Sequence, residues 1–222
     1  MNHYDLMSYH VFKSTVFSDG KVDHDNSFFE DKRILICPHC ENPFWHDSMV
    51  IGEEDYSHED LPTSKTVMDK EFARSVNYPE QIARYYNELI HNGFATNTER
   101  ETYLRILLWR SINDMIRYQQ PFFKSINNYV LKRPFRFLKS RRQANLAFNR
   151  LGAIHKENLR QLCSIFDPMN DDDQLLKAEM YREAGERKKA LALLRPLSSR
   201  STRYIRKVKR ATLLFQTRVF ML

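Results

Sequence analysis

The stretch DDDQLLKAEMYREAGERKKALALLRPL, Asp171 to Leu197, carries more information on the fold than any other part of the chain. Small residues at Ala178 and Ala190 allow two antiparallel helices to approach closely. Gly185 stands between them and can adopt the backbone conformation that a tight turn requires. Apolar residues such as Leu194 recur at helical spacing. The stretch therefore predicts a hairpin of two helices.

Five positions of this stretch follow the small, aromatic, glycine, small and large apolar pattern of a tetratricopeptide repeat: Ala178, Tyr181, Gly185, Ala190 and Leu194. The stretch therefore resembles one helix hairpin of that family. Gln174 and Lys177 depart from the pattern, because the family has large apolar residues there. Since one hairpin cannot bury its own apolar face, the resemblance implies neighbouring helices stacked on both sides.

Weaker signals for such neighbours lie on either side. Phe148 and Gly152 stand 33 residues before Tyr181 and Gly185, so ANLAFNRLGAIHKENLRQL is expected to be a degraded copy of the hairpin. The stretch 201–222 is expected to form a closing helix stacked on the hairpin. Its inward-facing residues would be Ile205, Val208, Leu213, Phe215 and Val219.

Helical periodicity also extends towards the N-terminus of this region. Pro79 is placed to begin a helix and Gly93 to stop it, and Thr98 with Glu101 forms a capping-box pattern for the next helix. Further helices are expected over 121–133 and 138–166. The sequence thus predicts a mainly α protein, either a helical-hairpin array of the tetratricopeptide-like kind or an irregular bundle, with a small N-terminal β unit.

That β unit is predicted from two short apolar runs, YHVFKSTVF before the turn signal SDGK, and RILIC before a cysteine pair. We therefore divide the chain into a β unit at 1–52, an acidic linker at 53–69 and a helical basic domain at 70–222. Residues 1–69 hold 14 acidic and 5 basic residues, a balance of −9, and the remainder holds 14 acidic and 30 basic residues, a balance of +16. These opposite charges predict that the two parts attract one another.

The tetrapeptide Cys-Pro-His-Cys, residues 37–40, is identical to the active-site motif of periplasmic disulfide-forming thiol oxidoreductases, which have a thioredoxin fold. This resemblance implies that Cys37 is the nucleophile, that His39 lowers its pKa and that Cys40 resolves the mixed disulfide. The surrounding sequence lacks the strand, helix and further strands that this fold requires. The redox interpretation is therefore the least favoured one.

The same segment resembles the first half of a zinc ribbon, in which a strand delivers two thiolates through a tight turn. His46 and His24 are the candidates to complete a zinc site with Cys37 and Cys40. Cys163 lies within a helical pattern and is expected to be a small buried core residue. The alternative is that no metal binds and that the two thiols stay reduced in a plain structural turn.

Two long segments of the helical half contain no acidic residue, 115–156 and 187–222. Such basic runs fit an acidic protein partner, and they also fit nucleic acid, because phosphates bind clustered cations. A merely solvated basic surface is the third interpretation. The candidate binding residues are Arg133, Arg136, Lys139, Arg141, Arg142, Arg203, Arg206, Lys207 and Arg210.

Enzymatic chemistry is not indicated, because the five glycines are too scattered for a phosphate-binding loop. The acidic run 171–173 is expected to cap a helix. The chain begins without an export signal, and no window reaches the roughly 18 apolar residues of a membrane span. We therefore expect a cytoplasmic, non-enzymatic interaction or scaffold protein without membrane contact.

Overall fold

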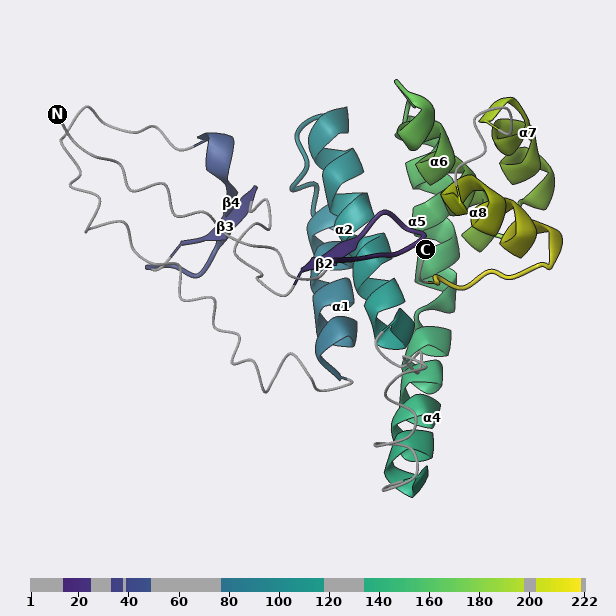
Figure 1. Ribbon diagram of the computed structural model, residues 1–222. Coiled ribbons are helices and arrows are strands. Elements are labelled where there is room, and N and C mark those ends of the chain that lie inside the picture. Colours follow the sequence, from purple (N-terminus) through teal and green to yellow (C-terminus); the bar gives the residue numbers. More distant parts are fainter. Residues whose placement is uncertain are drawn as a thin grey trace, which may run out of the picture. The chain divides into compact units, whose positions relative to one another are not determined.

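The computed structural model describes residues 14–24, 33–37, 39–48, 77–117, 134–197 and 203–220, and the described part is mainly helical, as predicted (Figure 1). The expected helix over 121–133 and the acidic linker lie outside these ranges. The helices are α1 Asn77–His91, α2 Thr98–Arg117, α4 Pro134–Arg150, α5 Gly152–Ile165, α6 Asp171–Glu183, α7 Arg187–Leu197 and α8 Arg203–Leu213. The strands are β1 Ser14–Val16, β2 Val22–His24, β3 Ile34–Ile36 and β4 Pro43–Trp45.

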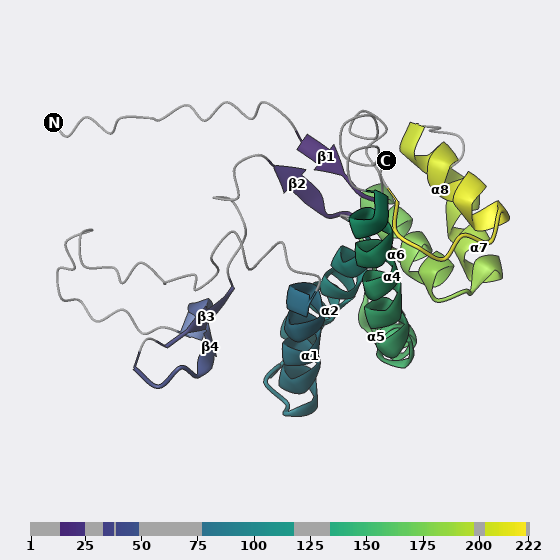
Figure 2. The same ribbon diagram turned by 90° about the horizontal axis from the view of Figure 1, so that it is seen from below.

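The chain divides into two compact units. One contains β3 and β4, and the other consists of residues 14–23 and 76–222. This division differs from the predicted one, because most of the β1–β2 hairpin belongs with the helices rather than with the second hairpin. The physical reason is burial: Phe17 is 3 % exposed and Asp19 is 0 % exposed in the helical core. The views in Figures 1 and 2 agree that this hairpin lies beside α2.

Local backbone and side-chain hydrogen bonds define the end of α1 and the start of α2. Gly93 stops α1 with a φ of 68°, and the Phe94 N–H donates to the Leu89 carbonyl at 3.0 Å. The cap of α2 is Asn97 rather than the expected Thr98, because the Asn97 side chain accepts a hydrogen bond from the Arg100 N–H at 2.8 Å. The error is one residue, and both residue types are favoured at this position.

Residues 134–165 form two helices arranged end to end, where the periodicity predicts a single helix over 138–166 (Figure 1). Their junction is Leu151, whose N–H reaches the carbonyls of Ala147 at 3.3 Å and Phe148 at 3.2 Å. The chain therefore continues in nearly the same direction through Gly152. The degraded hairpin predicted around Gly152 is not formed, because that residue lies in a helix instead of a turn.

The hairpin predicted from Asp171 to Leu197 is present as α6 and α7. Gly185 has a φ of 83°, and the Glu186 N–H donates to the Tyr181 carbonyl at 2.8 Å across the turn. Ala178 and Ala190 are both 0 % exposed, as the close approach of two helices requires. Whether the hairpin belongs to the tetratricopeptide family stays a prediction.

The last helix, α8, packs on this hairpin through Ile205 and Val208, which join one apolar cluster with Ala178, Leu194 and Leu197. It ends at Leu213, earlier than predicted, and Leu213 and Phe215 are exposed instead of facing inward. The following segment turns back across the unit. Val219 is buried as expected, but it lies in this returning segment and contacts the cluster of Phe17 and Ile116.

Candidate functional site

The helical unit has a core with many charged side chains, which we call the polar cluster. It joins the β1–β2 turn to α2, α5 and α6, and each member is at most 5 % exposed: Ser18, Asp19, Asn113, Arg117, His155, Glu179, Arg182 and Glu183. Ionic groups are rarely buried so completely unless they are paired. The polar cluster is therefore a candidate functional site.

Asp19 is the centre of one half of the polar cluster. Arg117 holds both carboxylate oxygens, with Nη1 donating to Oδ1 at 2.9 Å and Nη2 donating to Oδ2. Asn113 Nδ2 adds a third hydrogen bond at 3.0 Å. Burial alone would raise the pKa of Asp19, but Arg117 and Asn113 together hold that pKa below its usual value. Asp19 is thus a fixed anion at neutral pH.

The Asp19–Arg117 pair continues towards the protein surface. Asp114 Oδ1 accepts a hydrogen bond from Arg117 Nε at 2.7 Å, and its Oδ2 lies 2.8 Å from the Lys21 ammonium group. Lys21 follows the same turn as Asp19 and precedes β2. Cations and anions therefore alternate from the buried Asp19 through Arg117 and Asp114 to the partly buried Lys21.

The other half of the polar cluster is centred on α6. Glu183 accepts hydrogen bonds from Trp109 Nε1 at 2.7 Å and from Asn113 Nδ2 at 3.1 Å, and His155 Nε2 lies 3.6 Å from it. Arg182 donates to Glu179 through Nε at 2.7 Å and through Nη2 at 2.5 Å. Burial raises the pKa of Glu179, and the Arg182 guanidinium opposes that shift.

Arg182 also fixes the returning C-terminal segment. Its Nη1 donates to the Gln216 carbonyl and its Nη2 donates to the Arg218 carbonyl at 3.0 Å. Next to it, the Ser18 N–H donates to the Phe220 carbonyl at 2.8 Å, and the Phe220 N–H donates to Ser18 Oγ at 3.2 Å. The polar cluster thus joins two ends of the unit to the helices. Its carboxylates and guanidinium groups pair with one another, while Asn113 Oδ1 and His155 Nε2 are buried without a hydrogen-bond partner among the described residues, so the arrangement is mainly that of a structural clamp.

The sequence did contain a signal for this clamp. Trp109, Asn113 and Arg117 recur every four residues, which places them on one face of α2 beside the apolar row. Polar residues at core-facing positions predict a buried partner. The partner, Asp19, could not be identified from sequence, because it lies in a turn far away along the chain.

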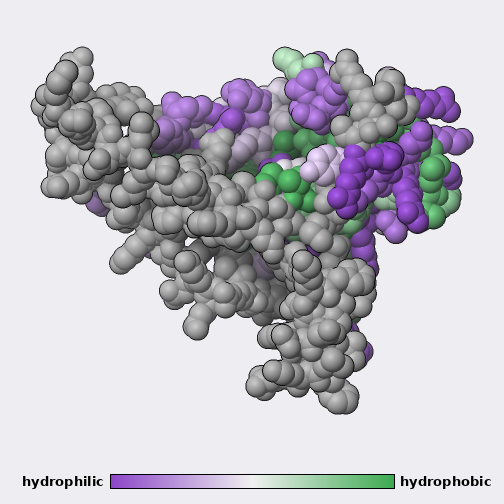
Figure 3. Space-filling view, viewed as in Figure 1, coloured by the Kyte–Doolittle hydropathy of each residue, from purple (hydrophilic) through white to green (hydrophobic). Residues whose placement is uncertain are grey.

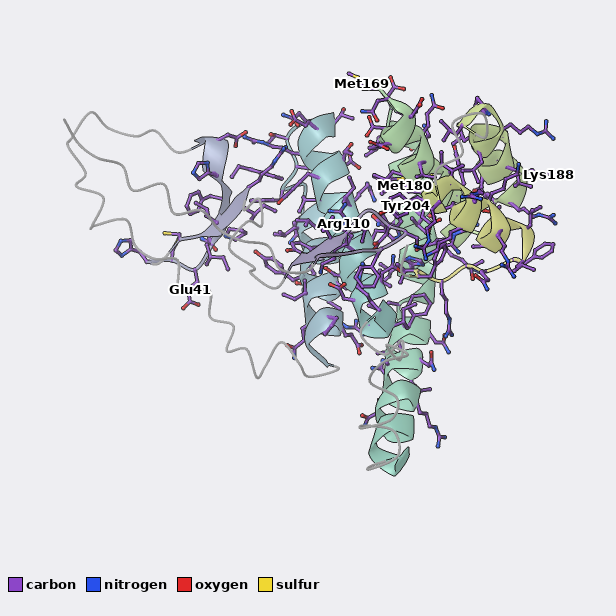
Figure 4. The ribbon with its side chains drawn as sticks, viewed as in Figure 1. Glu41, Arg110, Met169, Met180, Lys188 and Tyr204 are labelled. Carbon is purple, nitrogen blue, oxygen red and sulfur yellow. The ribbon has the colours of Figure 1, made fainter. Side chains whose placement is uncertain are left out.

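The cysteine pair lies in the loop of the β3–β4 hairpin, which we call the knuckle. Ile36 pairs with Pro43, the Cys37 N–H donates to the Asn42 carbonyl at 2.9 Å, and the Glu41 N–H donates to the Cys37 carbonyl at 2.9 Å. Glu41, at the tip of the hairpin in Figure 4, has a φ of 57°. Backbone N–H groups of Cys40 and His39 bond to the Cys37 sulfur and hold the pKa of its thiol below its usual value.

The hairpin register separates His46 from the knuckle. The His46 N–H donates to the Arg33 carbonyl at 2.8 Å, which places His46 at the opposite end of the hairpin from Cys37, about 13 Å along the strands. His46 is therefore not a ligand beside Cys37 and Cys40 within this hairpin. His24 ends β2, and its side chain lies outside the described residues. In the described part, no group of three or more His, Cys, Asp or Glu side chains can hold a metal ion.

Cys163 is buried in the cluster with Trp109, Leu159, Leu162 and Met180, as expected. Burial raises the pKa of its thiol to about 12. A thiol of that kind is protonated and unreactive at neutral pH. Cys163 is a core residue.

The candidate cations divide into two groups. The side chains of Arg133, Arg136, Lys139 and Arg141 lie outside the described residues, and Arg142 is exposed on α4. Arg203, Arg206 and Arg210 are exposed on α8, and Lys207 is half-buried. We call Arg203, Arg206 and Arg210 the cationic face. Figure 3 shows hydrophilic side chains gathered over α7 and α8.

Apolar side chains lie next to the cationic face. Leu213, Leu214 and Phe215, which we call the apolar tip, are 45 %, 57 % and 71 % exposed. Arg187 at the start of α7 stacks on the Phe215 ring, with 4.4 Å from its guanidinium carbon to the ring centroid. The side chain of Lys188 projects outward from α7 nearby (Figure 4). Sequence periodicity missed this surface, because it placed Leu213 and Phe215 in the core.

Comparison with models of protein families, with curated proteins and with solved structures finds no significant match to this chain. Among the helices of the described part, none has both the length and the apolar character needed to cross a bilayer.

Proposed function

We propose that the protein is a non-enzymatic scaffold whose helical unit binds an acidic protein partner through the cationic face of α8. The observation that carries this proposal is the placement of charge on α8. Ile205 and Val208 are buried, while Arg203, Arg206 and Arg210 are exposed, and from Arg187 onward the chain has no acidic residue. Such a surface attracts a complementary anionic one and speeds encounter with it.

The polar cluster supports the scaffold interpretation. Its buried carboxylates and guanidinium groups are engaged with one another, so these groups hold the unit together rather than bind a ligand. A binding function on a rigid unit requires no catalytic residue. It requires a surface whose side chains are held in place by the packing beneath them.

Charge reversal tests this function. The double variant Arg206→Glu/Arg210→Glu should weaken binding of a fluorescent polyglutamate probe by at least tenfold at low salt. Lys156→Glu/Arg160→Glu on α5 is the matched control, because it makes the same charge change at the same spacing on exposed residues. If both variants bind the probe equally well, the cationic face is not the binding surface.

The nucleic-acid alternative is decided by the same variants. Binding to single-stranded RNA of mixed sequence would fall steeply with salt if phosphates were the ligand. If wild type binds RNA more tightly than polyglutamate at equal salt, and Arg206→Glu/Arg210→Glu no longer binds RNA, the partner is nucleic acid and not an acidic protein.

A second proposal concerns the knuckle, which we infer supplies two thiolates to a structural zinc ion. The amide donors to the Cys37 sulfur support it, because they favour the thiolate form that zinc requires. Tetrahedral zinc needs two further ligands. His24 and the Cys37–Cys40 pair of a second chain are the candidates for them, whereas His46 is excluded by the register.

Metal analysis of the purified protein tests the zinc proposal. We expect up to one zinc per chain, or one per two chains if two knuckles share the ion, and its loss in Cys37→Ser together with a lower melting temperature. Cys163→Ser is the control for metal content, since that thiol is buried in the helical unit. A protein free of zinc after purification and after zinc titration would exclude a metal-bound knuckle.

A further inference from the structure

The end of α8 has a phenylalanine, Phe215, at a position with positive φ. The Gln216 N–H donates to the Ala211 carbonyl at 3.0 Å and the Phe215 N–H donates to the Thr212 carbonyl at 3.3 Å, the paired bonds of a Schellman motif. This motif places the residue after the C-cap in the left-handed region, and that residue, Phe215, has a φ of 55°. Glycine is favoured there because a Cβ crowds the following carbonyl.

Two other helices of the unit follow the usual rule. Gly93 ends α1 with a φ of 68° and Gly185 ends α6 with a φ of 83°. In the same kind of turn, α8 has a bulky aromatic residue in place of glycine. A bulky residue with positive φ is a conformational outlier, and such outliers concentrate at binding and catalytic sites.

Burial does not explain the choice of phenylalanine. The Phe215 ring is 71 % exposed, so its apolar surface stabilises the fold little. Of the eight large hydrophobic residues that are exposed in the described part of the chain, four lie on α8 or directly after it: Tyr204, Leu213, Leu214 and Phe215. The local conformation is unfavourable and the ring is largely exposed to water, which is the combination expected of a residue selected for contact with a partner.

We propose that the apolar tip is the anchor of a docking site for an acidic peptide segment that carries large apolar residues among its carboxylates. Arg187 fixes the Phe215 ring by stacking on it, and Arg206 and Arg210 lie on the helix that ends at the tip. An aromatic anchor beside arginines is the usual composition of a binding hot spot. This inference rests on the proposed function and adds the apolar half of the partner's chemistry.

The composition of the site favours a protein segment. Single-stranded nucleic acid stacks its bases on aromatic rings, but Leu213 and Leu214 offer no ring for stacking. Aliphatic residues beside an aromatic ring instead fit leucine or phenylalanine side chains of a peptide, and the arginines fit its carboxylates bidentately. The absence of acidic residues from Arg187 onward supplies the charge complementarity.

The variant Phe215→Gly separates this proposal from a structural role. It should raise the melting temperature by about 2–4 °C, because glycine relieves the left-handed conformation. It should also weaken binding of a short peptide of alternating leucine and glutamate by about tenfold. A side chain that only supports the fold would give the opposite sign in the thermal measurement.

Two controls complete the experiment. Met169→Ala removes another exposed apolar side chain, 87 % exposed beside α6, and should leave peptide binding unchanged. A second peptide, with serine in place of leucine, measures binding through the cations alone and should be unaffected by Phe215→Gly. If Phe215→Gly binds the leucine peptide as well as wild type does, while Arg206→Glu/Arg210→Glu still weakens binding, Phe215 is not an anchor. The proposed function would then still hold.

Three other outcomes would contradict the anchor proposal. If neither peptide binds wild type, the proposed function fails with the anchor. If Phe215→Gly lowers the melting temperature, the inference that this residue is unfavourable for folding is overturned. Binding of vesicles of anionic phosphatidylserine, lost in Phe215→Gly while neither peptide binds, would assign the apolar tip to a membrane surface instead.

Discussion

Removing the carboxylate of Asp19 should destabilise the helical unit more than any single change on its surface. In Asp19→Ala, the Arg117 side chain, 0 % exposed, would keep Asp114 but lose the partner that binds both of its Nη atoms. Asn113 would lose a hydrogen bond as well. Breaking a buried ion pair from one side costs about 3–5 kcal/mol, because the remaining charge stays desolvated.

This free energy corresponds to a fall in melting temperature of roughly 6–20 °C for a unit of this size. Urea unfolding followed by far-ultraviolet circular dichroism, with thermal melts in parallel, measures it. Asp167→Ala is the control, because Asp167 is exposed and should change stability by no more than about 0.5 kcal/mol. Equal effects of the two variants would refute the assignment of Asp19 to a buried clamp.

A double-mutant cycle then isolates the pair. Arg117→Leu alone leaves Asp19 buried without its main partner, whereas Asp19→Ala/Arg117→Leu removes both charges. The double variant should be less destabilised than the sum of the single variants by about 0.5–3 kcal/mol or more. Strict additivity would mean that the two residues stabilise the unit independently.

Three further predictions concern pH, packing and thiol reactivity. The folded pKa of Asp19 is lowered, so its stabilising contribution is present above the unfolded pKa and is lost as pH falls through the folded pKa. The difference in unfolding free energy between wild type and Asp19→Asn should therefore shrink below about pH 4. A difference that stays constant with pH would contradict this prediction. Gly20→Ala should lower the free energy of unfolding by about 1–3 kcal/mol, because Gly20 has a φ of 72° and a Cβ there would lie 3.1 Å from the Leu176 side chain. Gly152→Ala is the control, because the space around Gly152 is open, and it should leave stability in urea unchanged or raise it. In the metal-free native protein, Cys37 and Cys40 should react with a thiol reagent at neutral pH and Cys163 only after unfolding, because burial raises the pKa of Cys163 to about 12; three fast thiols would disprove its burial.

Glu179 affects the pH dependence in the opposite direction. Its folded pKa is raised, so its contribution favours the folded state below the unfolded pKa and is lost as pH rises through the folded value. The acid limb of wild-type stability therefore combines two opposed contributions. Only the comparison with Asp19→Asn separates them.

Features that depend on neighbouring residues could be predicted from the sequence. Gly93 and Gly185 stop helices where their positions predict, and the SDGK signal forms the turn between β1 and β2. Each of these depends on glycine or on a short polar motif whose backbone preference is intrinsic. The α6–α7 hairpin could be predicted for the same reason, because its turn and its small residues are adjacent in the sequence.

Features that depend on distant residues could not be predicted in this way. Nothing near Asp19 indicates that Arg117 binds it, and nothing in the zinc pattern indicates that the strand register separates His46 from Cys37. The end of α8 was missed for a different reason. The residue in the left-handed position is Phe215, so the glycine that marks other helix ends is absent.

Two hydrogen bonds join residues 18 and 220, one between backbone groups and one to the Ser18 hydroxyl, and they also determine when the unit can be completed during synthesis. Arg182 has two backbone acceptors, Gln216 and Arg218, which are made more than 30 residues after it, since the sequence separations are 34 and 36. While those residues are still inside the ribosome, Arg182 must remain hydrated or pair with Glu179 and Glu183 of its own helix. The N-terminal turn likewise lacks the Phe220 pairing until then. We therefore expect the helices to associate first during translation and the unit to close in a later, cooperative step, once residues 216–220 have emerged.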